Sequence, residues 1–265
     1  MSDQTLVNET PEKERFKERV IDIVGMRLDA LTRSEALETV ARWGRSGRGR
    51  TVCLANVHMA VETSRSDLFR SAVNAADLVL ADGRPLVWAA RLAGIAAEQS
   101  RGTDFMLALC QLAQVRGFSI GLLGGREAVL TRLTERLRER FPTLKIAYAY
   151  SPPFRSLSAE EDAAIIAGIR AAAPDFLFVG LGCPRQELWM AGHRARIGSV
   201  MLGVGAAFDF IAGEIRQAPR WMQRGGLEWF YRLIREPRRL IGRYASTNSR
   251  FLLLLALRFR GRRSR

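Results

Sequence analysis

Short hydrophobic runs alternate with longer amphipathic or Ala/Leu-rich segments along most of the chain. The runs are rich in β-branched and aliphatic residues and lie at 20–25, 51–56, 77–83, 118–125, 144–150, 175–182 and 199–205. The segments between them favour helices, at 33–43, 66–75, 84–93, 103–116, 126–140, 158–172 and 185–195. This alternation predicts an α/β fold with a mostly parallel, Rossmann-like sheet flanked by helices. A ligand site is then expected beyond the carboxyl ends of the strands.

The alternation ends near Gly213, and the chain after it favours helices only. The i, i+3, i+4, i+7 spacing of an apolar helical face is followed by Leu227, Phe230, Tyr231 and Ile234. Pro237 is expected to kink that helix or to restart it. We therefore expect three parts: a polar N-terminal extension (1–18), an α/β catalytic domain (19–212) and a basic, amphipathic helical part (213–265), called the C-terminal appendage below.

The basic charge is concentrated in this appendage. The net charge of the chain is +14, and fourteen arginines against two glutamates lie between Arg216 and Arg265. Intervals of three and four residues allow one helical face to be shared by Arg232, Arg235, Arg239 and Arg243. The same segment holds aromatic residues and the run FLLLLAL at 251–257, which is far shorter than the roughly 20 residues that span a bilayer. This mixture suits the surface of an anionic membrane. A nucleic-acid-binding protein is the alternative, but its basic residues would be spread over a docking surface.

The remaining composition limits the class of site. The N-terminus has no apolar segment of a secretory signal, so we expect the protein in the cytoplasm. Three separated cysteines without a CxxC are expected to be reduced thiols. The only histidines are His58 and His193, which excludes a site with several histidine ligands but leaves a carboxylate-held metal open.

One group of candidate site residues lies in the stretch GLGCPRQELWM at 180–190. Gly180 and Gly182 let backbone N–H groups approach a ligand, and a helix that starts near Pro184 turns its positive end toward an anion. Gln186 and Glu187 fall in the first turn of that helix, at the edge of the sheet. The alternative is a tight turn between strand and helix, in which Glu187 complements the helix dipole.

Other candidates follow other predicted strands. Asp82 ends the run DLVLADG, where a carboxylate can act as a general base with a pKa raised by partial burial, or can simply form an Asx turn. Asn56 has the same position at the end of TVCLAN, and Gly124 begins a glycine pair at the end of another predicted strand. The chain has no P-loop sequence, no dinucleotide fingerprint in its first βα unit and no GxSxG elbow. These absences argue against a P-loop enzyme, an ordinary dehydrogenase and an α/β-hydrolase.

Taken in order, these segments resemble the WecG/TagA/CpsF family, glycosyltransferase family 26. The resemblance covers roughly residues 20–245 and is carried by LANVHM, NAADLVLADGRPLVWAARL, RGTDF, GLLGG, VGLGCPRQELWM and GVGAAFDFIAGEIRQAPRWMQRGGLEWFYRLIREPRRLIGRY. It implies an inverting transferase that moves a sugar from a UDP-sugar to a polyprenyl-diphosphate-linked sugar. It also implies peripheral binding at the cytoplasmic face of the bacterial inner membrane, a role in cell-surface or exopolysaccharide biosynthesis, and a homodimer as one permitted assembly.

The resemblance also implies roles for individual residues. Asp82 matches the base that deprotonates the acceptor hydroxyl, Asn56 a sugar contact, and Gln186 a sugar or phosphate contact. The other residues expected to bind substrate are Arg101, Gly124, Gly182, Glu187 and the appendage arginines Arg232, Arg239 and Arg243. Arginines and helix N-termini can neutralise the leaving diphosphate, so no metal and no cofactor is expected; the absence of a DxD motif agrees with this.

The sequence leaves the donor sugar open among N-acetylmannosamine, its uronic acid and glucuronic acid. Leu54 stands where some members of the family have threonine, which removes one polar contact with the sugar. Arg84, directly after the Asp-Gly corner, favours a uronic acid as a hypothesis. A non-catalytic scaffold that docks polysaccharide enzymes to the membrane is the alternative within the same fold, and the joint presence of Asp82, Asn56 and Gln186 argues against it.

Overall fold

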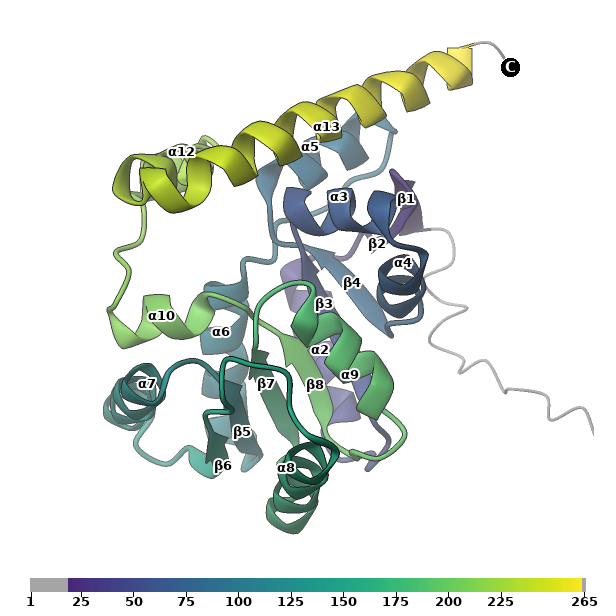
Figure 1. The fold of residues 1–265 in the computed structure, drawn as a ribbon. Coiled ribbons are helices and arrows are strands. Elements are labelled where there is room, and N and C mark those ends of the chain that lie inside the picture. Colours follow the sequence, from purple (N-terminus) through teal and green to yellow (C-terminus); the bar gives the residue numbers. More distant parts are fainter. Residues whose placement is uncertain (1–18, 264–265) are drawn as a thin grey trace, which may run out of the picture.

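Six of the seven predicted hydrophobic runs form one parallel sheet in the computed structural model of the chain. The structure describes residues 19–263, except for the side chains of residues 239, 243 and 258–263. The order of the strands is β4-β3-β8-β7-β5-β6 (Figure 1). Their bounds are β3 Arg50–Ala55, β4 Leu78–Ala81, β5 Ser119–Gly124, β6 Lys145–Tyr150, β7 Phe176–Gly180 and β8 Val200–Gly203. The predicted α/β class and the parallel sheet are confirmed.

Helices cover both faces of the sheet and bury a separate apolar cluster on each. One face is covered by α2 (Arg33–Trp43), α6 (Gly102–Arg116), α7 (Glu127–Arg140) and α10 (Ala207–Ala212). The other cluster includes side chains from α3 (Val57–Arg65), α4 (Asp67–Asn74), α5 (Arg84–Leu92), α8 (Ala159–Ala172) and α9 (Arg185–His193). Because both faces are covered, β8 is buried along its whole length and β3 from its second residue onward, as their continuous apolar runs require.

The first predicted strand lies outside this sheet, which corrects the expectation from the alternation. β1 (Val20–Ile23) pairs antiparallel with β2 (Met26–Asp29), a strand that the pattern did not predict. The two are joined at Val24 and Gly25, which both have a positive φ, of 58° and 82°. Such a two-residue turn makes a hairpin, whereas a parallel partner would need a longer crossover.

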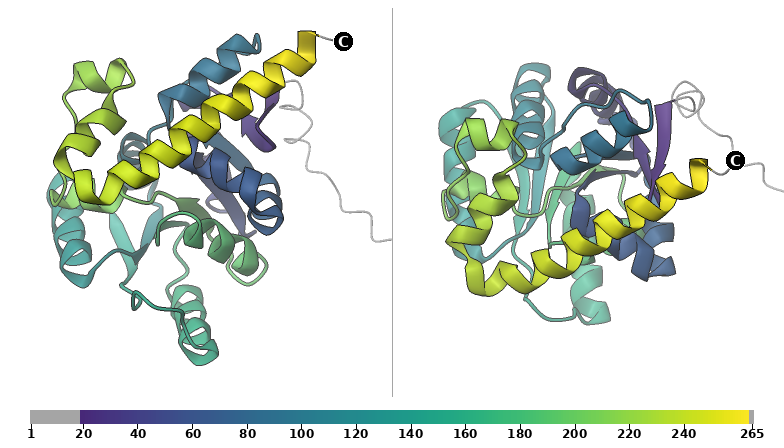
Figure 2. Two further views of the ribbon diagram at one scale, coloured as in Figure 1. Left: turned by 45° about the horizontal axis from the view of Figure 1, so that its top comes forward. Right: turned by 90° about the horizontal axis from the view of Figure 1, so that it is seen from above.

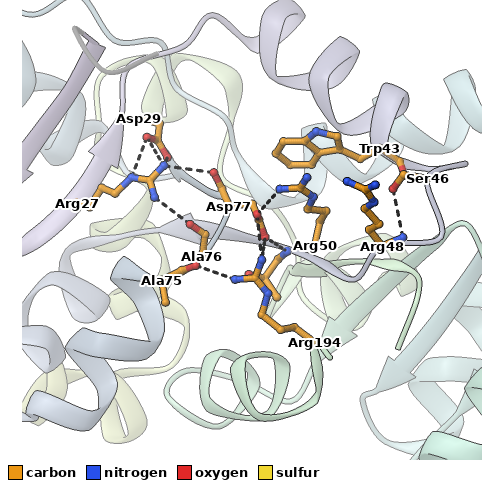
Figure 3. A network of polar contacts seen from close by, with 11 residues as sticks. Arg27, Asp29, Trp43, Ser46, Arg48, Arg50, Ala75, Ala76, Asp77 and Arg194 are labelled. Carbon is orange, nitrogen blue, oxygen red and sulfur yellow. Dashed lines mark hydrogen bonds and ion pairs between the residues drawn. The ribbon is translucent and has the colours of Figure 1, made fainter. Parts of the chain in front are cut away.

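A network of buried charges fixes this hairpin to the edge of the large sheet (Figure 3). Asp29 is buried and forms an ion pair with the guanidinium of Arg27 at 2.8 Å. It also accepts a hydrogen bond from the backbone N–H of Val79 in β4 at 2.7 Å. Asp77, also buried, pairs with Arg50 at 2.7 Å and with Arg194 at 3.1 Å. Asp77 precedes β4 and Arg50 begins β3, so the network lies at the amino ends of these strands and away from the expected ligand edge.

Two short helices of the sheet region were missed by the sequence pattern. α3 follows β3 at once because Asn56 caps it, and α10 follows β8. The helix predicted at 185–195 begins at Arg185, as predicted, and ends at His193.

After Gly213 an irregular segment leads into three helices, α11 (Arg220–Arg224), α12 (Glu228–Arg235) and α13 (Pro237–Arg263). α12 ends just before Pro237 and α13 starts with it, so the predicted restart is confirmed. α13 lies across α3, beside α5 and over the end of the sheet (Figures 1 and 2). Its inner face is formed by Leu240, Thr247 and Phe251, all buried and spaced at whole helical turns.

The outer surfaces of these helices are rich in apolar side chains. Those of the appendage are Trp221, Leu227, Trp229, Phe230, Ile234, Ile241, Leu252, Leu253 and Leu257, and the neighbouring α5 adds Trp88 and Leu92. We call this set the apolar roof. Within the part of the chain that the structure describes, every helix is too short or too polar to cross a membrane.

Candidate active site at the carboxyl ends of the strands

Asp82 occupies the corner directly after β4. Its backbone N–H donates to the carbonyl of Ala55 at 2.7 Å, which extends the pairing of β3 and β4 by one residue. One side-chain oxygen, Oδ1, accepts a hydrogen bond from the backbone N–H of Gly102 at 2.9 Å. Among the atoms that the structure describes, none donates a hydrogen bond to Oδ2, so with respect to these residues the oxygen is free to take a proton.

The environment of this carboxyl raises its pKa to about 7. Burial is the main cause, and the negative charge of Glu228 adds to it. The hydrogen bond from Gly102 and the positive charges of Arg101 and Arg232 lower the pKa of Asp82, but by less. A carboxyl with a pKa near neutrality is suited to general acid–base catalysis.

Asn56 lies beside Asp82 because β3 and β4 are neighbours in the sheet, with Ala55 opposite Ala81. A Cβ atom on Gly83 would lie 3.7 Å from the Cα and Cβ atoms of Asn56. The side-chain carbonyl of Asn56 caps α3 by accepting a hydrogen bond from the N–H of Met59 at 3.2 Å. In the described part of the chain its amide nitrogen has no acceptor, and this group remains available to a sugar hydroxyl.

Arg101 connects this corner to the C-terminal appendage. It is buried and immediately precedes Gly102, the donor to Asp82. Its guanidinium donates to the side-chain carbonyl of Gln223 in α11 and to Glu228 in α12, the latter at 3.2 Å. The sequence predicted a substrate contact for Arg101; in the structure its nitrogens hold α11 and α12 against the edge of the sheet.

Arg232 reaches the same region from α12. Its guanidinium lies over the ring of Phe210 in α10, 5.5 Å from the ring centre. Its buried Nε has no hydrogen-bond partner among the described residues, and its charge is close enough to lower the pKa of Asp82. The other two expected arginines, Arg239 and Arg243, belong to α13, and their side chains lie outside the described residues.

The glycine turns after β5 and β7 pack tightly on each other. Gly124 has a φ of 121°, and a Cβ atom there would lie 2.5 Å from the backbone of Gly180. A Cβ atom on Gly180 would in turn lie 2.7 Å from the ring of Phe208. Gly182, with a φ of 80°, has open space around it. A side chain at Gly182 would thus meet no neighbour, and its positive φ favours glycine, whereas Gly124 is glycine because a neighbouring strand occupies the space.

Gln186 and Glu187 are both buried in the first turn of α9. The side-chain carbonyl of Gln186 accepts from the N–H of Gly182 at 3.1 Å, and its amide donates to Glu187 at 2.8 Å. Burial raises the pKa of Glu187, against hydrogen bonds from Gln186 and Cys183 that lower it. Gln186 therefore shapes the Gly182 turn, and Glu187 orients the amide of Gln186 from the protein interior.

The structure brings Asn56, Asp82, Arg101 and Arg232 together at one corner. Gly182 and Gln186 lie after β7, three strands from β4, which corresponds to about 14 Å at the usual strand spacing. Sequence reasoning missed Glu228, which contacts Arg101 and raises the pKa of Asp82. Its signal was the string GLEW within the appendage, to which no role was assigned. In the described chain no three His, Cys, Asp or Glu side chains are grouped to hold a metal ion.

Comparison with known proteins gives a match along nearly the whole chain. The sequence profile described as "Glycosyl transferase WecG/TagA/CpsF family" matches residues 21–265. A protein of Staphylococcus aureus strain MW2 is 29% identical over 238 residues, which cover 88% of this chain and 91% of the relative. Its name is N-acetylglucosaminyldiphosphoundecaprenol N-acetyl-beta-D-mannosaminyltransferase. Proteins of the same name in strains NCTC 8325 and MRSA252 are also 29% identical over the same length.

Proposed function

Because the chain belongs to the WecG/TagA/CpsF family of glycosyltransferases, we propose that it transfers a sugar from a UDP-sugar, with inversion, to N-acetylglucosamine linked to a polyprenyl diphosphate. The names of the Staphylococcus aureus relatives support N-acetylmannosamine as the donor sugar among the three that the sequence left open, and they support this acceptor. The observation that carries the proposal is the half-buried carboxyl of Asp82, whose pKa is raised to about 7, beside Asn56 and Arg232.

In the proposed reaction Asp82 is the general base. An acceptor hydroxyl placed at Oδ2 of Asp82 gives its proton to this oxygen while its own oxygen forms the new bond to the anomeric carbon of the donor. The bond from that carbon to the diphosphate breaks on the opposite face, and the nucleotide leaves with the electron pair. This single displacement inverts the anomeric centre. The N–H of Gly102 holds Oδ1, so the carboxylate faces the acceptor in a fixed orientation.

Arg232 is the described residue that is best suited to stabilise the leaving diphosphate. Its guanidinium is held over Phe210 and keeps a donor nitrogen without a partner in the described structure. A fixed positive charge at the position where negative charge develops lowers the barrier without reorganisation. Arg239 and Arg243 are proposed to act with it from α13.

We propose that the apolar roof binds the surface of the bilayer. Arginines occur together with exposed aromatic side chains on α11 and α12 and with exposed aliphatic side chains on α13, as on helices that bind the interface of an anionic membrane. A polyprenyl-linked acceptor is confined to that surface, so binding there brings the site to its substrate. By this proposal the enzyme is a peripheral protein of the cytoplasmic face of the inner membrane.

The test is the acceptor-dependent release of UDP. Purified protein is incubated with each UDP-sugar and with N-acetylglucosamine linked to a short polyprenyl diphosphate, with EDTA present and again with Mg²⁺. We expect release from one donor, and a loss of about 10²- to 10⁴-fold in kcat for Asp82→Asn, the range for removing a general base. Wild-type release that does not depend on the acceptor, or unchanged kcat in the folded variant, would contradict the proposal. No release from any donor would contradict it too, and would favour a non-catalytic scaffold.

A further inference from the structure

A basic groove lies along the outer face of α6, under α11. Its volume is about 1010 Å³, which is the size of a small-molecule site. Six arginines line it: Arg33, Arg84, Arg101, Arg140, Arg220 and Arg224. In its lining, as the described residues form it, Asp104 is the one carboxylate. We call this cavity the α6 groove.

Most of these arginines are not neutralised inside the protein. Arg101 is paired with Asp104 and Glu228. In the described structure, Arg84, Arg220 and Arg224 have neither a carboxylate nor a hydrogen-bond partner, and Nε of Arg84 is buried. A concave site with excess positive charge and free guanidinium groups attracts a compact polyanion. Phosphate esters fit best, because guanidinium can bind two phosphate oxygens at once.

One end of the α6 groove begins beside the candidate base. The groove is lined by Gln99, whose side-chain amide donates to the backbone carbonyl of Asp82 at 2.7 Å, and by Arg101, which precedes the N–H that holds Asp82. From there it follows α6 from Asp104 to Gln111, about 10 Å along the helix axis. A ligand with a hydroxyl at Asp82 can therefore extend its phosphates into the groove.

We propose that the α6 groove, at Arg84, Arg220 and Arg224, binds the diphosphate of the lipid-linked acceptor. This inference rests on the proposed function, in which two diphosphates meet in one active centre. Arg232 serves the donor diphosphate, and the second diphosphate needs separate cations because the two repel each other.

The orientation of α11 supports the acceptor over the donor. Arg220 and Arg224 line the groove, whereas Trp221 of the same helix is 66% exposed and belongs to the apolar roof. A polyprenyl diphosphate combines the same two chemistries, since its phosphates are adjacent to a chain that stays in the membrane. The donor nucleotide has no such chain.

The kinetic test uses full-length Arg220→Gln/Arg224→Gln in vesicles that contain anionic lipid. Both side chains are exposed, so the fold is expected to persist. We expect the KM for the acceptor to rise at least tenfold while the KM for the UDP-sugar changes less than twofold. The matched control Arg138→Gln/Arg170→Gln removes the same charge from exposed positions outside the groove and should change neither value. A rise in the KM of the donor alone, or no rise for the acceptor, overturns the proposal.

A binding arm keeps the inference separate from the proposed function. Farnesyl diphosphate, which carries no sugar, is titrated into wild type and into both double variants by calorimetry, with UDP as a competitor. We expect the groove variant to bind it at least tenfold more weakly than the wild type and the control, and UDP not to displace it. If wild type shows no sugar transfer but these binding results hold, the proposed function fails and the groove assignment stands. Equal binding by all three proteins, or displacement by UDP, overturns the groove assignment.

Discussion

Replacing Asp82 by asparagine should make the protein more stable above neutral pH. In the unfolded chain an aspartate is ionised above about pH 4. In the folded protein the pKa of Asp82 is raised to about 7, mainly by burial, so the folded state binds more protons between these two values. The stability of the wild type must therefore fall as the pH rises through this window, and the loss is complete above about pH 8. Asparagine is always neutral and avoids this loss.

The size of the effect follows from the pKa. The change from 3.8 to about 7 corresponds to at most about 4 kcal/mol, at about 1.4 kcal/mol for each pKa unit. Asp82 is half-buried and keeps some contact with solvent, so we expect about 2 kcal/mol. For a protein of this size that is a rise in Tm of about 4–8 °C. Asparagine can still accept the hydrogen bond from Gly102, so that contact is kept.

The assay is thermal unfolding of wild type and Asp82→Asn between pH 5 and 9. The difference in Tm should widen up to about pH 8 and then stay constant. Asp67→Asn, which alters an exposed carboxylate on α4, is the control and should show no such widening. If the variant is equally or less stable than the wild type at pH 8.5, the carboxyl is not held in an unfavourable environment, and the argument for its role as a base fails with it.

Three further predictions follow from contacts around the site. Phe210→Leu removes the ring under Arg232 and should lower kcat about tenfold with little change in the donor KM, whereas Phe210→Tyr should keep near wild-type activity. Arg101→Gln should release the appendage from the sheet, which should give faster proteolysis between α10 and α12 and faster amide hydrogen exchange in α11. Unchanged cleavage would show that Arg101 does not hold the appendage. Gly124→Ala should lower the free energy of unfolding, measured with urea, by about 1–3 kcal/mol because its Cβ atom would overlap the next strand. The control Gly192→Ala, in open space on a helix, should be neutral or slightly stabilising in the same assay.

The fold was largely predictable because the strands inside the large sheet are buried on both faces and form continuous apolar runs; only the edge strand β6 is largely exposed. β1 has the same appearance in the sequence, but its partner follows it directly, and the turn at Val24 and Gly25 lacks the usual Asn-Gly signal. α3 was hidden because Asn56 ends one element and caps the next, so strand and helix leave no loop between them.

The site was predictable where it depends on strand ends and not where it depends on packing. Asp82 and Asn56 end adjacent strands, and their residue types indicated the chemistry. The role of Arg101 depends on helices that lie more than 100 residues later in the chain, at Gln223 and Glu228. Glu187 looked like a first-turn residue facing the ligand, but the helix turns it into the interior. No local pattern contains these contacts.

The packing of α13 on α3 fixes the distance between the apolar roof and Asp82. The first turn of α3 is capped by Asn56, so the helix that carries much of the apolar roof is joined through one layer of side chains to the corner of Asp82. If the roof rests on lipid, the distance from the bilayer to the base is set by the protein and does not vary between encounters. The fixed distance then selects the acceptor by length: Asp82 can reach a hydroxyl one sugar away from the lipid phosphate. In an acceptor already extended by a further sugar, the terminal hydroxyl lies too far from the bilayer for Asp82 to reach.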